Sequence, residues 1–187
     1  MAGKATSTRT AILDRAVDLA SSDGLEGVTI GRLAGELQMS KSGLFAHFGS
    51  KEDLQLATVQ AAAQRFLDDV VLPAQAAEEG APRLRAYCEG YIDHLERNVF
   101  PGGCFWSAAA AEFDDRPGPV REAIKGGVVA WLDELERQAR TAGAREPRQL
   151  AFEIYSLGLG ANASHRLLGD TKAFERARAA IERLLPD

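Results

Sequence analysis

The sequence has few of the residues that build covalent, metal or membrane sites. Its 187 residues include two cysteines, Cys88 and Cys104, too few for a fold held together by disulfides. Its three histidines show neither a His-x-x-x-His nor a Glu-x-x-His spacing, so no helical metal site is predicted. No apolar run approaches the roughly 20 residues of a membrane span, and the N-terminus lacks the apolar segment of a signal peptide. We therefore expect a cytoplasmic protein without membrane contact, cofactor or metal.

An excess of positive charge is also missing. The chain carries 22 lysines and arginines against 27 acidic residues, a formal net charge of −5. Residues 1–54 hold six basic and seven acidic side chains. Nucleic-acid-binding domains often carry a basic surface, so composition alone argues mildly against one here. The placement of the basic residues points the other way, because several lie in the N-terminal tail or near predicted helix starts, where they could face phosphate: Lys4, Arg9, Arg32, Lys41 and Lys51.

Two helix starts lie eleven residues apart near the N-terminus. Thr29 precedes a short amphipathic run, and Ser40 opens a second run with apolar anchors. Serine and threonine oxygens at such positions accept hydrogen bonds from the first helical turn. Ser50 begins a third helix, with Asp53 three residues on in a pattern close to a capping box. The two short helices and their tight turn predict a helix-turn-helix, whose second helix can enter a DNA major groove.

Residues 40–54 read S-K-S-G-L-F-A-H-F-G-S-K-E-D-L, and here the chain resembles the TetR family of bacterial transcriptional regulators. The family signature is a threonine-started helix, a small-residue turn, then Ser-Lys-x-x-Leu-Tyr-x-His-Phe-x-Ser-Lys-x-x-Leu. The chain departs from it at Phe45, where the family usually has a tyrosine whose hydroxyl reaches a phosphate. Gln38 replaces the usual glycine of the turn.

The side of the second short helix that faces away from Leu44 and Phe48 carries Lys41, Ser42, Gly43 and Ala46. There Lys41 and Ser42 would meet base edges or phosphate, and Gly43 and Ala46 would allow close approach to the groove; an ordinary solvent-exposed face is the alternative. The resemblance further implies that Thr29, Phe45, His47 and Lys51 position the DNA backbone, the last by a direct phosphate contact. Arg32, near a helix start, would also face phosphate. For His47 an alternative stays open, since its ring could stack on Phe48 or cap the short helix.

The rest of the chain reads as helices separated by glycine, proline and acidic turns, without the strict alternation of strands. Nine helices are expected, three in a DNA-binding head and six in a C-terminal ligand-binding and dimerisation domain. We divide the chain into a disordered tail, the helix-turn-helix domain and the C-terminal domain: residues 1–7, 8–54 and 55–187. Pro73 is expected to end the long helix that begins at Lys51.

Aromatic and polar residues of the C-terminal half are candidates for an effector pocket. They are Tyr87, Tyr91, His94, Cys104, Phe105, Trp106, Phe113 and Trp131. Each could equally be a core residue, since large apolar side chains are mostly buried in any protein. The last two predicted helices carry a candidate dimer interface, as in the family: Gly158, Ala161, Phe174, Ala177, Ile181 and Leu184. Packing within one chain is the alternative.

These patterns predict a homodimeric repressor that binds a near-palindromic operator in double-stranded DNA and is released by a small-molecule effector. One alternative is a redox- or ligand-sensing helical protein with a weakened DNA-binding head, using Cys88 or Cys104. An enzyme is not expected, because Glu112, Cys104 and His165 have no catalytic spacing.

Overall fold

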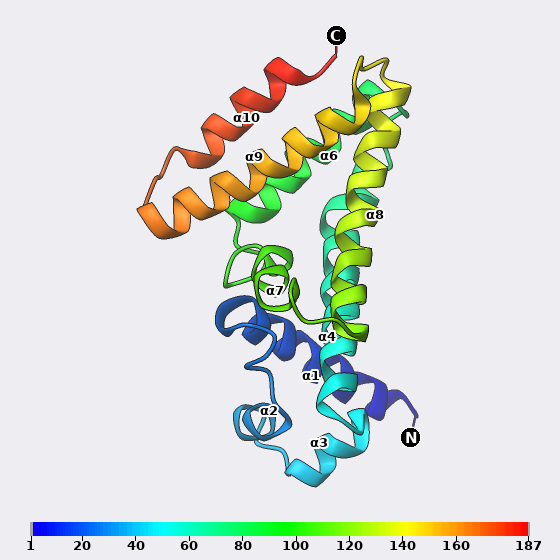
Figure 1. The fold of residues 1–187 in the computed structure, drawn as a ribbon. Helices are drawn as coiled ribbons and strands as arrows, with labels where there is room; N and C mark the ends of the chain where they lie inside the picture. The colour runs from blue at the N-terminus through cyan, green and yellow to red at the C-terminus, as the bar shows by residue number, and fades with distance from the viewer. Residues whose placement is uncertain (1, 187) are drawn as a thin grey trace. The chain divides into compact units, whose positions relative to one another are not determined.

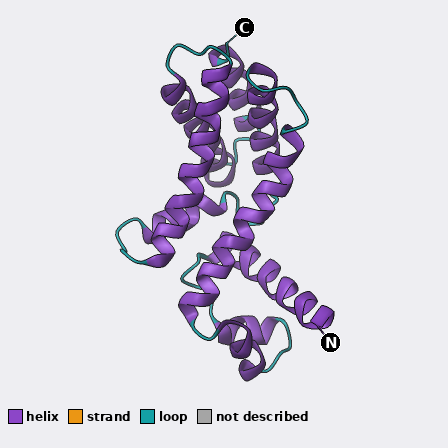
Figure 2. Ribbon diagram, turned by 90° about the vertical axis from the view of Figure 1, so that its right-hand side faces the viewer, coloured by secondary structure: helices purple, strands orange, loops and turns teal. Residues whose placement is uncertain are grey.

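The computed structural model describes the backbone of residues 2–186 and the side chains of residues 8–186. Throughout this part of the chain all regular structure is helical, as Figure 2 shows, which confirms the all-α prediction. The elements in chain order (Figure 1) are α1 (Ala2–Asp23), α2 (Ile30–Glu36), α3 (Lys41–Phe48), α4 (Lys51–Phe66), η1 (Leu67–Val71), α5 (Leu72–Ala74), α6 (Ala81–Glu96), α7 (Phe105–Phe113), α8 (Pro119–Thr141), α9 (Pro147–Leu168) and α10 (Ala173–Leu184).

Pro73 does not end the long helix, contrary to the sequence-based prediction. The helical backbone continues through it, because η1 is a π-helical turn directly before α5. The backbone N–H of Leu72 reaches back five residues to the carbonyl of Leu67. The hydrogen bonds thus change from the usual four-residue spacing to a five-residue spacing just before Pro73, which has no N–H to donate. The helix therefore continues through the proline without a break.

The first helix also starts earlier than expected. A tail was predicted for residues 1–7, whereas α1 begins at Ala2; Met1 lies outside the described residues. Alanine and lysine favour helix, and the single glycine at position 3 costs only about 1 kcal/mol relative to alanine.

The chain forms two compact units that do not follow a single boundary in the sequence. Unit 1 comprises Met1–Gln64 and Phe100–Lys125, and unit 2 comprises Arg65–Val99 and Gly126–Asp187. The helix-turn-helix thus shares a unit with α7, which packs against α1. The sequence-based prediction placed one boundary after residue 54, and it did not assign Phe100–Lys125 to the same unit as the helix-turn-helix.

Unit 1 has one core beneath its helices. The buried apolar residues of its first three helices include Ile12, Val17, Leu33, Leu44 and Phe48. The segment before α7 lies directly on the end of α1, where the Gly102 N–H donates to Ser21 Oγ at 3.0 Å. A β-carbon on Gly102 would lie 1.7 Å from the Ser21 carbonyl oxygen, so this approach needs glycine.

Unit 2 is built on α6, which contacts both α9 and α10. Its core contains an aromatic cluster in which Trp131 meets the rings of Phe66, Tyr87 and Tyr91, with centroids 5.1, 5.5 and 5.7 Å away. Gly158 of α9 lets that helix approach the cluster, since a β-carbon there would lie 2.2 Å from Tyr91 Cε1. Among the described residues no helix is long and apolar enough to cross a membrane.

Candidate nucleic-acid interface

Side-chain caps begin both helices of the helix-turn-helix. Thr29 Oγ1 accepts from the Arg32 backbone N–H at 3.2 Å, and Ser40 Oγ accepts from that of Gly43 at 3.1 Å. Both predicted N-caps are therefore present, and each satisfies one of the free N–H groups of its first turn. The following helix starts in the same way, with the Asp53 N–H donating to Ser50 Oγ at 3.0 Å. The Ser50 hydroxyl itself donates to the Asp53 carboxylate at 2.6 Å.

The turn between α2 and α3 holds a residue in left-handed backbone conformation. Gln38 has φ +54°, a region that residues with a β-carbon adopt at a cost. The next residue closes the turn, as the Met39 N–H donates to the Ala34 carbonyl at 2.9 Å. The turn therefore has the geometry that suits the family's glycine, with glutamine in its place.

The outer face of α3 is exposed. Leu44 and Phe48 are buried, whereas the other side is open to solvent or half-buried: Lys41, Ser42, Gly43, Phe45, Ala46 and His47. The Phe45 side chain is 53% exposed, which is unusual for a large aromatic residue. The His47 ring centroid lies 6.2 Å from that of Phe48 and the ring planes are tilted by 52°, so the two rings are neighbours but are not stacked.

Acidic neighbours pair with two of the expected phosphate-binding cations. Arg32 forms ion pairs with Asp23 and with Glu36, and Lys51 pairs with Glu26 at 2.5 Å. The Arg15 guanidinium, followed by that of Arg32, lowers the pKa of Glu36. In a segment with seven acidic and six basic side chains, these ion pairs place acidic groups directly against basic ones. The sequence did not reveal the Lys51–Glu26 pair, because its partners lie 25 residues apart.

The predicted effector residues fall into two groups. Unit 1 contains Cys104, Phe105, Trp106 and Phe113, and unit 2 contains Tyr87, Tyr91, His94 and Trp131. All eight are buried. The predicted list thus comprises two aromatic clusters, each inside its own unit.

The unit 2 cluster combines apolar rings with polar atoms. Tyr87 Oη donates to Glu134 at 2.8 Å, and burial, helped by this carboxylate, raises the pKa of Tyr87 to about 12. His94 Nδ1 lies 2.7 Å from Asp69 Oδ2, and burial lowers the pKa of His94. The indole N–H of Trp131 is buried without a hydrogen-bond partner in the described structure. An indole donor in this state can bind an acceptor atom that enters the cluster.

The predicted dimer residues lie on two sides of the α9–α10 pair. Ala161, Ala177 and Leu184 line an outer groove of about 870 Å³ between these helices. Gly158 instead faces Tyr91, and Phe174 is buried with its ring 5.1 Å from that of His165. Ile181 lines a second groove, which α10 forms with α6.

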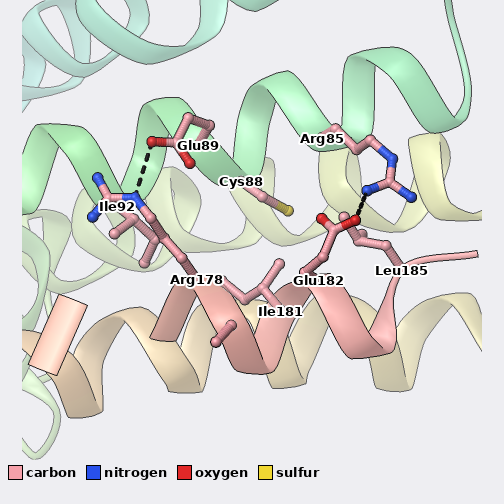
Figure 3. Close-up of a pocket in the computed structure, with 9 residues that line it drawn as sticks. Arg85, Cys88, Glu89, Ile92, Arg178, Ile181, Glu182 and Leu185 are labelled. Carbon is pink, nitrogen blue, oxygen red and sulfur yellow. Dashed lines mark hydrogen bonds and ion pairs between the residues drawn. The ribbon is translucent and has the colours of Figure 1, made fainter. Parts of the chain in front are cut away.

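That second groove contains Cys88 (Figure 3). Cys88 extends from α6 toward α10, and the rim carries ion pairs between Arg85 and Glu182 and between Arg178 and Glu89. Burial raises the pKa of Cys88 to about 12 and that of Cys104 above its usual range. Since the thiolate is the reactive form of a cysteine, the burial of both thiols disfavours the redox alternative.

Acidic residues near α7 have structural partners. Glu112 accepts a hydrogen bond from the backbone N–H of Glu26 at 3.0 Å. Over the described chain, no group of three or more histidine, cysteine, aspartate or glutamate residues is arranged to hold a metal ion.

Comparisons with known proteins identify the family. The model of the bacterial regulatory proteins of the tetR family matches residues 12–58, and that of the tetracyclin repressor-like C-terminal domain matches residues 80–181. The HTH-type transcriptional repressor NemR of Escherichia coli strain K12 is 24% identical over 186 residues, covering 95% of this chain and 94% of NemR.

Solved structures share the fold. A TetR transcriptional regulator from Chloroflexus aurantiacus J-10-FL superposes with a TM-score of 0.86 at 24% identity, covering 96% of this chain and 94% of that one. AibR, solved in complex with isovaleryl coenzyme A and operator DNA, superposes with a TM-score of 0.76 at 24% identity. The match covers 94% of this chain and 97% of AibR. The two family models, over residues 12–58 and 80–181, establish that the chain belongs to the TetR family of DNA-binding transcriptional regulators.

Proposed function

We propose that the chain is a homodimeric repressor that binds a near-palindromic operator and leaves it when a small molecule binds unit 2. The observation that carries the proposal is the exposed outer face of α3. It presents Lys41, Ser42 and Ala46 to solvent on a helix whose opposite side is anchored by Leu44 and Phe48. A helix held in this way can enter a major groove without disturbing the core of its unit.

The outer groove of α9 and α10 supports a twofold dimer. Phe152 on its rim is 58% exposed, and the lining continues through small residues such as Gly160 and Ala180. An apolar surface with small residues allows close approach of the same surface of a second copy. A twofold dimer would place two α3 helices roughly 34–36 Å apart, which requires a near-palindromic operator.

The unit 2 cluster supports release by an effector. Its rings offer apolar contact, and Trp131 offers a buried donor that lacks an acceptor. AibR binds both isovaleryl coenzyme A and operator DNA, so a protein of this fold has both kinds of partner. A ligand that favours one dimer conformation changes DNA affinity through a coupling free energy of typically about 1–3 kcal/mol.

Selection of genomic fragments tests the proposal. The purified protein is mixed with fragmented genomic DNA and excess random competitor at about 0.1 M salt, and retained fragments are sequenced. We expect one near-palindromic sequence to be enriched. Enrichment of no sequence over the competitor would contradict operator binding. Substrates of the products of adjoining genes are then the first effectors to try in a release assay.

The Lys51→Ala variant tests the phosphate contact. Removal of one phosphate-binding cation should weaken binding to all sequences alike and lower the slope of log affinity against log salt by about one unit. Lys172→Ala is the matched control, because Lys172 is an exposed lysine at the start of α10 in the other unit. Equal slopes for Lys51→Ala and Lys172→Ala would remove Lys51 from the DNA contacts.

A further inference from the structure

Glu26 lies beside the start of α4 and forms an ion pair with the first residue of that helix, Lys51. Lys51 Nζ donates to Glu26 Oε1 at 2.5 Å, and the two side chains are 43% and 48% exposed. The pair is therefore on the surface, where a DNA backbone can reach it. It joins the loop after α1 to the residue that the family motif assigns to phosphate binding.

Several groups from other parts of unit 1 fix the position of Glu26. Its backbone N–H donates to Glu112 Oε2 at 3.0 Å. The second carboxylate oxygen of Glu26 accepts a hydrogen bond from Gln55 Nε2 at 3.4 Å. The same oxygen forms an ion pair with Arg116 Nη1 at 3.4 Å. Two residues earlier, a β-carbon on Gly24 would lie 1.6 Å from Glu112 Oε1, so the loop that carries Glu26 packs closely against Glu112. The Glu26 carboxylate is thus held in place for Lys51.

The ionisation state of Glu26 also favours its pairing with Lys51. The hydrogen bond from Lys51 lowers the pKa of Glu26 below its usual range. Glu26 is consequently ionised at neutral pH and offers Lys51 an anionic oxygen. A phosphate oxygen of DNA offers the same kind of acceptor, and charge-assisted bonds of both kinds have similar lengths.

We propose that Glu26 is an internal competitor for DNA phosphate, which occupies Lys51 in the free protein and must give it up when DNA binds. This inference rests on the proposed function, because it takes Lys51 as a phosphate contact. It identifies Glu26 as a residue that sets DNA affinity through another residue, not through contact with DNA. Such a competitor weakens binding to every sequence equally, since the phosphate backbone carries no sequence information.

The test compares the Glu26→Gln variant with the Glu52→Gln variant. Both remove one negative charge next to Lys51, but only Glu26 has an ion pair with it in the structure. Dissociation constants are measured on a random-sequence duplex over a range of salt concentrations. We expect Glu26→Gln to bind about two- to fivefold more tightly than Glu52→Gln, the range that an exposed ion pair contributes. Glu26→Ala should act in the same direction, and thermal melting checks that each variant is folded.

A double-mutant cycle isolates the pair. In the Lys51→Ala background, Glu26→Gln should tighten binding no more than Glu52→Gln does, because there is no lysine to release. An equal gain from Glu26→Gln and Glu52→Gln would overturn the inference, since the effect would then be long-range charge. A gain from Glu26→Gln that persists in full without Lys51 would also overturn it. Failure of the unmutated protein to bind any DNA would count against the proposed function instead.

Discussion

At the scale of the residue, Phe45 gives the exposed face of α3 an aromatic ring without a hydroxyl. Its ring is 53% exposed, so a tyrosine oxygen at this position would reach solvent without being buried. In the family, the tyrosine at this position typically contacts a phosphate.

We expect Phe45→Tyr to bind operator and random duplexes more tightly by the same factor, roughly tenfold or more, the value of one hydrogen bond to a charged group. The measurement is a pair of dissociation constants, one for each duplex. Phe45→Leu is the control, because it changes the ring and adds no hydroxyl. A gain confined to the operator would contradict the prediction and show that the hydroxyl contacts a base.

Side-chain interactions could be predicted from the sequence where the two partners lie close together along the chain. The caps at Thr29 and Ser40 were predicted, because each bonds to a backbone N–H three residues away. The exposure of Lys41 and Ala46 was also predicted from helical spacing. The pairing of Glu26 with Lys51 was missed, because a surface ion pair between distant residues leaves no periodic signal in a sequence.

At the scale of the element, the tight turn between α2 and α3 contains a correctable strain. Gln38 adopts φ +54°, which costs a residue with a β-carbon about 1 kcal/mol relative to glycine. We expect Gln38→Gly to raise the free energy of unfolding by up to about 0.5 kcal/mol, because the entropy that glycine gains in the unfolded chain offsets part of the relieved strain. Urea denaturation measures the change. Gln38→Ala, which keeps the β-carbon, should leave the free energy of unfolding close to that of the unmutated protein, and an equal gain from both variants would contradict the explanation.

The contact between η1 and α6 makes stability depend on pH. His94 is buried beside Asp69, and burial lowers the pKa of His94 below its ordinary value of about 6.5. In the unfolded chain the imidazole takes up its proton at about pH 6.5, while in the folded protein it does so only at lower pH. The unfolded state therefore binds more protons in this window, and the free energy of unfolding falls as the pH falls from above 6.5 through the folded-state pKa.

His94→Gln should make the urea midpoint less dependent on pH between about 7.5 and 5.5. Asp69 also faces the imidazole, so Asp69→Asn serves as a second comparison that leaves the histidine in place. An unchanged pH dependence in His94→Gln would assign the effect to other groups.

Helix boundaries show where sequence patterns fail at this scale. The glycine, proline and acidic turns predicted helices separated by breaks, and the described chain has this organisation. The prediction that Pro73 ends the long helix was wrong, because a π-helical turn directly before the proline compensates for its missing N–H. That turn has no simple sequence signal. The pattern of breakers therefore located the helices but not this continuation.

At the scale of the whole molecule, the proposed dimer places an apolar rim residue at the contact. Phe152→Glu would bury a charge in that contact, so we expect the dimer to dissociate, with a drop in molecular mass by light scattering and a loss of operator affinity. Gln149→Glu is the matched control, because it adds the same charge on α9 and does not line the groove. Dimers that persist in Phe152→Glu would place the interface elsewhere.

The two compact units are also a feature of the whole molecule that the sequence did not reveal. The segment Phe100–Lys125 belongs to the same unit as the helix-turn-helix, although more than 30 residues of unit 2 separate them. The residues of α7 carry no signal that α1 is the helix they pack against, because that contact joins segments far apart in the chain.

The contact between Gly102 and Ser21 has a consequence for genetics. Every missense change at Gly102 adds a β-carbon where the Ser21 carbonyl stands, so all alleles at this codon should share one phenotype regardless of the new side chain's chemistry. Gly35, whose β-carbon would meet nothing within 4 Å, should tolerate small replacements. In a mutational screen of this regulator, Gly102 would thus appear as an intolerant codon far along the chain from the helix-turn-helix whose unit it completes.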